Sequence, residues 1–129
     1  MILAPKVNED SHPYWYGRIL AIFHANICHI RANSHSCQSQ KIEFLFVRWF
    51  GRDTTPTPGW KRKRLPRLAF VPGNDKQAFG FIDPSQVVRS VHLIPAMKWG
   101  KVAKLLPRSV IARGLSDPEH DWQLYYISM

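Results

Sequence analysis

The sequence predicts a mainly β fold, namely a single partly open β-barrel of about five to seven strands with at most one short helix. Three observations lead to this prediction. Aromatic residues, which favour strands, make up 12% of the 129 residues. Prolines outnumber glycines by ten to seven, which favours short strands joined by rigid turns. The apolar residues show no sustained 3.6-residue period, so long helices are not expected.

Two long segments are the strongest strand candidates. From Tyr14 to Ile30, apolar residues occupy both alternating positions, which is typical of a strand buried on both faces or turned by a bulge, with Gly17 as a candidate bend. The small polar segment 31–40 predicts an exposed hairpin loop. A second strand follows at 41–51, where β-forming residues dominate.

The later elements are expected to be shorter. Pro56 and Pro58 predict a turn before a third strand at 63–71. Further strands are expected around Phe79, over 87–97 and over 121–129, and the segment 101–106 is a candidate for one short helix. The predicted core consists of Ile19, Ile22, Phe23, Phe44, Phe46, Val47, Phe50, Leu68, Phe70, Phe81, Val88, Val91 and Leu93.

Composition limits the domain organisation and the partners. No shift in composition divides residues 1–129, so we expect one domain, and its abrupt end on a strand is typical of a fragment of a longer protein. The net charge of +9 favours an acidic partner, either nucleic acid, preferably DNA, or an acidic chromatin protein. No membrane span, signal peptide, cofactor or small-molecule substrate is expected, which indicates an intracellular and nuclear protein. Free thiols are the expected state of Cys28 and Cys37, with a hairpin disulfide as the alternative.

A basic run is the first candidate site. It lies within seven residues that contain no acid, next to an aromatic residue and to arginines of the preceding strand and turn. Such a mixture suits phosphate contacts and base stacking, although a solvated loop would look the same. The predicted nucleic-acid-binding residues are Arg48, Arg52, Trp60, Lys61, Arg62, Lys63, Arg64 and Arg67.

Three other kinds of site are weaker. Zinc ligands are available at His24, Cys28, His35 and Cys37, but their spacing is loose, and we expect no metal. Hydrolase and nucleotide-binding motifs are absent, so we predict no catalytic residue and no enzyme. Aromatic residues on neighbouring strands could form a cage for a methylated ammonium, although core packing is their commoner role. The residues of this possible aromatic pocket are Tyr14, Tyr16 and Trp49.

The order of motifs along the chain resembles a known family. The segments are "HPYWYGRILAIFHANI", "IEFLFVRWFGRD", "GWKRKRLPRLAFVP", "AFGFIDPSQVVRSVHLIPAM" and "DWQLYYIS". They resemble the region downstream of the catalytic core in fungal transposase-like proteins of the Plavaka and KDZ groups, which are related to CACTA elements. The resemblance runs from His12 to about Ser128 and implies an accessory domain, because it brings no catalytic acid with it.

A second, weaker resemblance concerns the fold. "YGRILAIF", "VRWFGRD" and "VVRSVHLIP" are similar to segments of the bromo-adjacent homology (BAH) domain, a barrel of the SH3-like kind that docks chromatin partners. Together, the basic run and the first resemblance imply a non-catalytic nucleic-acid or chromatin-binding module of a transposase-like protein. The alternative is a BAH-like peptide reader, whose binding would survive raised salt. The third possibility is a metal-dependent nuclease or hydrolase, which would need several carboxylates in one cleft.

Overall fold

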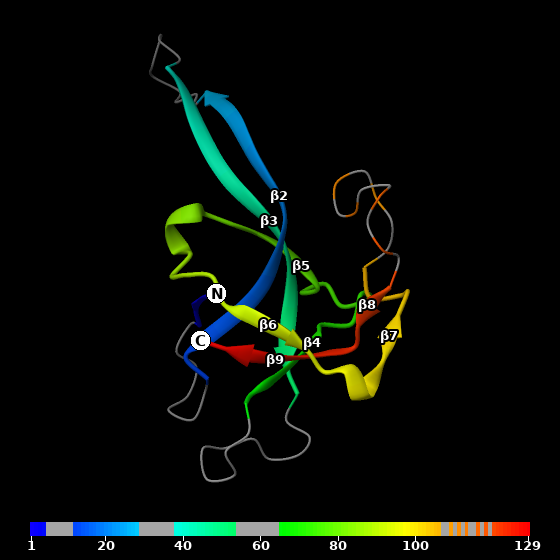
Figure 1. Ribbon diagram of the computed structural model, residues 1–129. Coiled ribbons are helices and arrows are strands. Elements are labelled where there is room, and N and C mark those ends of the chain that lie inside the picture. Colours follow the sequence, from blue (N-terminus) through cyan, green and yellow to red (C-terminus); the bar gives the residue numbers. More distant parts are fainter. Residues whose placement is uncertain are drawn as a thin grey trace.

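The computed structural model describes residues 1–4, 12–28, 38–53, 65–106, 109, 111, 113, 116, 118 and 120–129. The fold is mainly β: of the residues that the structure describes, 59% lie in strands, and they form no helix of seven or more residues. Its sheet curls strongly into a half-barrel, as Figure 1 shows. The predicted fold class, a mainly β and partly open barrel, is confirmed.

All strand pairs of the described residues are antiparallel. Seven strands form the main sheet in the order β1-β2-β3-β4-β9-β6, with β5 added against β3. They are β1 (Ile2–Leu3), β2 (Tyr14–Cys28), β3 (Ser39–Arg52), β4 (Arg67–Phe70), β5 (Phe79–Ile82), β6 (His92–Pro95) and β9 (Leu124–Ser128). A separate pair consists of β7 (Lys101–Val102) and β8 (Asp121–Trp122), and two 3-10 turns are η2 (Pro84–Gln86) and η3 (Met97–Trp99).

The two long strands form one hairpin, as predicted. The register of β2 and β3 runs from Tyr16 opposite Phe50 to Cys28 opposite Ser39, with a shift between Ile19 and Ala21. The predicted bulge therefore exists, but it lies between Ile19 and Ala21 and not at Gly17. In Figure 1 the far half of this hairpin extends away from the curled sheet, so the strands there lack a second layer.

The core lies where β2, β3, β4 and β9 come together. Tyr16, Phe50, Leu68, Phe70 and Ile127 form one buried cluster. The rings of Phe50 and Phe70 stack with their centroids 4.3 Å apart. Since apolar burial is the main stabilising term in folding, this cluster stabilises the region where these four strands meet.

Part of the predicted core is confirmed and part is wrong. The buried members are Val47, Phe50, Leu68 and Phe70, and the half-buried members are Phe23, Phe44, Phe46, Val91 and Leu93. Ile19, Ile22, Phe81 and Val88 are exposed, Ile22 by 73% and Phe81 by 65%. Ile22 is exposed because it lies on the projecting part of the β2–β3 hairpin, and Phe81 is exposed because it lies on the edge strand β5. In both places one face of the strand has no covering layer.

Three further expectations need correction. Residues 101–106 contain no helix, because Lys101 and Val102 pair with β8. The strand expected over 87–97 is reduced to β6, since Val87 makes only an isolated bridge to Ile2. Cys28 is disulfide-bonded and not a free thiol.

Within the described residues, no helix has the length and apolar character that crossing a membrane requires.

Candidate functional site

An aromatic pocket lies where the start of β2, the end of β3 and the start of β5 meet. The antiparallel register sets Tyr16 opposite Phe50, and β5 places Phe79 opposite residue 48 of β3. The pocket has a volume of about 630 Å³, within the roughly 300–1,000 Å³ typical of ligand pockets. Its aromatic lining residues are Tyr14, Trp15, Tyr16, Trp49, Phe50 and Phe79. All three residues of the predicted aromatic pocket thus line one pocket.

Trp49 is fixed in place by its neighbours. A Cβ atom on Gly80 would lie 2.6 Å from the indole Nε1, and one on Gly17 would lie 3.1 Å from Cε3, so the indole rests against two residues without side chains. The backbone N–H of Trp49 donates to the Ala78 carbonyl at 2.9 Å, and its carbonyl accepts from the Val71 N–H at 3.1 Å. The indole therefore has little freedom to turn away from the pocket wall.

His12 and Tyr16 form a polar contact in the pocket wall. The His12 Nε2 and the Tyr16 hydroxyl lie 2.9 Å apart, and the two rings stack with centroids 5.6 Å apart. Burial, followed by the positive charge of Arg52, lowers the pKa of His12. Burial also raises the pKa of the Tyr16 phenol. Both shifts favour neutral side chains on this wall at neutral pH.

The lowered pKa of His12 predicts a pH-dependent stability. The folded state binds a proton at His12 less readily than the unfolded state does. The stabilising contribution of the neutral ring to the free energy of unfolding is therefore complete above the ordinary pKa of 6.5, and it is lost as the pH falls from that value toward the folded pKa. We expect the free energy of unfolding to decrease as the pH is lowered below about 6.5, and His12→Gln to flatten this decrease. Urea unfolding at several pH values measures it; an unchanged slope in the variant would contradict the assignment.

Two cations lie in the same pocket. Arg52 ends β3, and Lys76 lies in the turn before β5; both side chains are exposed and both residues line the pocket. None of the described lining residues is acidic. The acids next to these cations in sequence are Asp53, which Arg67 engages at 2.7 Å, and Asp75, whose carboxylate accepts from the Gln77 N–H at 2.8 Å. The pocket therefore combines aromatic surface with positive charge.

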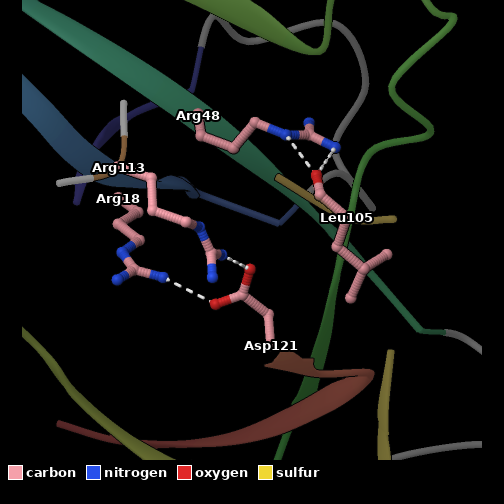
Figure 2. A network of polar contacts seen from close by, with 5 residues as sticks. All are labelled: Arg18, Arg48, Leu105, Arg113 and Asp121. Atoms are coloured by element: carbon pink, nitrogen blue, oxygen red, sulfur yellow. Dashed lines mark hydrogen bonds and ion pairs between the residues drawn. The ribbon is translucent and has the colours of Figure 1, made fainter. Parts of the chain in front are cut away.

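Arg48 does not belong to this surface, which corrects its predicted role. Its side chain is fully buried (0% exposed), and burial lowers the pKa of Arg48. Its guanidinium donates to the Ala78 carbonyl at 2.9 Å, to the Val71 carbonyl, and to the Leu105 carbonyl at 3.2 and 3.3 Å. Its Cζ lies about 5 Å from the centroids of the Phe70 and Phe79 rings. Arg48 thus ties separate chain segments together inside the protein, as Figure 2 shows for Leu105.

A buried ion pair network lies close to Arg48. Asp121 accepts from Arg18 at 3.1 Å and from Arg113 through its other carboxylate oxygen (Figure 2). Arg113 and Asp121 are buried, whereas Arg18 is about half exposed. The network connects β2, β8 and residue 113, and it has a structural role.

The other predicted site residues divide into two groups. Arg67 lies in β4, where it pairs with Asp53 and lies over the Trp99 ring at 5.4 Å, so its charge is partly used within the fold. Trp60, Lys61, Arg62, Lys63 and Arg64 lie outside the described residues. Of the weak zinc set, His24 is exposed on β2, Cys28 is disulfide-bonded, and His35 and Cys37 lie outside the described residues. The described part holds no group of three metal-binding side chains.

Sequence reasoning did not assign His12, Lys76 or Phe79 to a site. For the segment that contains Lys76 and Phe79, "GNDKQAFGF", the sequence predicts only a strand around Phe79. The signal that could have found them is Gly80, because a glycine within an aromatic strand marks the close approach of another group, here Trp49.

Comparison of the chain with family models, with curated proteins and with solved structures gave no match.

Proposed function

We propose that this chain is a non-catalytic binding module that engages nucleic acid, DNA in the first place, through the aromatic pocket and the cations around it. One observation carries the proposal: aromatic rings and the free cations Arg52 and Lys76 line the same pocket of about 630 Å³. Aromatic rings stack with bases, and cations attract phosphates. The net charge of +9 adds long-range attraction to the same kind of partner.

Two sequence features agree with this role. The basic run 61–64 follows Arg52 along the chain, and we include it in the proposed surface although it lies outside the described residues. The resemblance to transposase-like proteins brings an accessory role and no catalytic residue. A module that helps such a protein to hold DNA or chromatin fits both the basic run and the resemblance.

The charge of the pocket argues against a methylated ammonium ligand. A cation–π cage gains from neighbouring negative charge, whereas Arg52 and Lys76 would repel a bound cation. The second candidate function is a peptide reader that binds mainly by apolar burial against Tyr14, Tyr16 and Trp49. Binding that depends on apolar burial would keep its strength at raised salt, whereas phosphate binding would not.

The proposal predicts a salt-dependent loss of binding when the pocket cations are removed. Replacing both Arg52 and Lys76 with alanine should weaken binding of a DNA oligonucleotide about tenfold at low salt and reduce the slope of log affinity against log salt by about 1.5. The physical reason is that fewer counterions are released when fewer phosphates are neutralised. Fluorescence anisotropy over a salt series measures both quantities.

A matched control removes the same charges elsewhere. Lys98 and Lys104 are both exposed and do not line this pocket, so their double alanine variant should lower affinity only slightly. Equal losses in the two double variants would mean that net charge alone drives binding, and the pocket would have no part in it. If the parent protein bound no DNA at physiological salt, the proposed function would fail.

A further inference from the structure

We infer that the pocket accepts one unpaired base of a single-stranded nucleic acid, with the phosphates beside that base held by Arg52 and Lys76. The inference rests on the proposed function and names its substrate class. DNA and RNA strands share the chemistry that it requires, namely a flat aromatic base on a charged backbone.

The shape of the site favours an unpaired base over a duplex. Tyr16 and Phe50 belong to the buried core cluster, with 2% and 8% exposure, whereas Trp15, which also lines the pocket, is 48% exposed and offers an accessible aromatic surface. Bases in a duplex are stacked on one another, so the exposed Trp15 ring can stack on a base only after that base leaves the duplex stack. A single strand offers its bases without that cost.

The aromatic walls are already arranged before a ligand binds. Trp49 is held by its two backbone hydrogen bonds and by the close approach to Gly80. Trp15 lies edge-on to Trp49, with ring centroids 5.9 Å apart. Tyr16 is held by its contact with His12. Because these side chains lose little freedom on binding, most of the stacking energy remains available for affinity.

The cations are presented by two rigid segments. Arg52 is in register with Leu68 across β3 and β4. The turn that carries Lys76 is closed by the Asp75 N–H, which donates to the Pro72 carbonyl, and by the Ala78 N–H, which donates to the Asp75 carbonyl. The Asp75 carboxylate accepts from the Gln77 N–H at 2.8 Å. Within the described residues neither Arg52 nor Lys76 forms an ion pair, so both charges are free for phosphates.

The test separates stacking from charge. Binding of a short oligothymidylate, an oligouridylate, an abasic strand of the same length and a duplex of the same length is measured by fluorescence anisotropy. We expect the abasic strand and the duplex to bind about tenfold or more weakly than the strands with bases, since stacking contributes roughly 1–3 kcal/mol per base. A difference between the thymidylate and the uridylate strand identifies DNA or RNA as the better source of the base.

A pair of variants ties the effect to the pocket. Trp15→Leu should lower oligothymidylate affinity about tenfold and leave abasic affinity unchanged, whereas Trp99→Leu should change neither. Trp99 is the matched control, because it is 44% exposed and does not line the pocket. Thermal unfolding of both variants checks that the fold is retained.

The outcomes distinguish this inference from the function on which it rests. Equal, salt-dependent affinity for the abasic strand and the strands with bases would overturn the base pocket and leave nucleic-acid binding in place. An effect of Trp99→Leu as large as that of Trp15→Leu would also overturn it. If no strand and no duplex bound, the proposed function itself would be refuted.

Discussion

Replacing Arg48 with methionine is expected to lower the free energy of unfolding by about 3–5 kcal/mol. The guanidinium is fully buried and donates to the carbonyls of Val71, Ala78 and Leu105. Methionine fills similar space but donates no hydrogen bond, so these carbonyls would lose their partner, at roughly 1–3 kcal/mol each before relaxation. These acceptors are backbone carbonyls, so a second side-chain substitution cannot remove them and offset the loss. Urea unfolding followed by tryptophan fluorescence measures the loss.

Two further variants sharpen this prediction. Arg48→Lys keeps the charge but lacks the planar fork of donors, so it should recover only part of the lost stability. Arg89→Met changes an exposed side chain in the same chemical way and should alter the free energy of unfolding by about 0.5 kcal/mol or less. If Arg48→Met were no more destabilising than Arg89→Met, the structural role of Arg48 would be wrong.

Replacing Asp121 with asparagine is expected to lower the free energy of unfolding by about 3 kcal/mol. The substitution preserves the shape of the side chain and removes the negative charge that pairs with Arg18 and Arg113. Arg18 can turn to solvent, but the Arg113 side chain is only 3% exposed and would stay buried without its counter-charge. The same urea experiment measures this variant.

The control for Asp121 is an exposed aspartate with one hydrogen bond. Asp75→Asn keeps an oxygen that accepts from the Gln77 N–H, so a change of about 0.5 kcal/mol or less is expected. A loss of the same small size in Asp121→Asn would show that the buried pair contributes little. Raised salt should weaken the effect of Asp121→Asn only slightly, since buried pairs are poorly screened.

The main lines of the fold were predictable, because they depend on local features of the chain. Strand-forming residues and turn residues alternate clearly enough to indicate the long hairpin of β2 and β3 and the terminal strand β9. The errors fall where partners decide the outcome. Ile22 has the pattern of a core residue, yet the sequence does not reveal that the hairpin outgrows its covering layer. Segment 101–106 could form a helix locally, and pairing with β8 decides otherwise.

The candidate site was predictable only in part. Tyr14, Tyr16 and Trp49 were expected to meet on neighbouring strands, and they do line one pocket. Lys76 lies in a turn far along the chain from those residues, and only the pairing of β5 with β3 brings it there. Arg48 was misjudged because a charge within an apolar strand was read as a surface residue, whereas free backbone carbonyls around it made burial favourable.

By itself the sequence determined the fold class, the hairpin, the positive charge and the aromatic content, because residue preferences and periodicity act over short distances. Only the tertiary structure decided which charges are buried and which are free. Arg48 and Arg52 lie four positions apart on the same strand, yet one lies inside the protein among carbonyls and the other lines the pocket. The physical reason is that burial of a charge depends on hydrogen-bond acceptors from distant segments, and the residues near it in sequence do not reveal them.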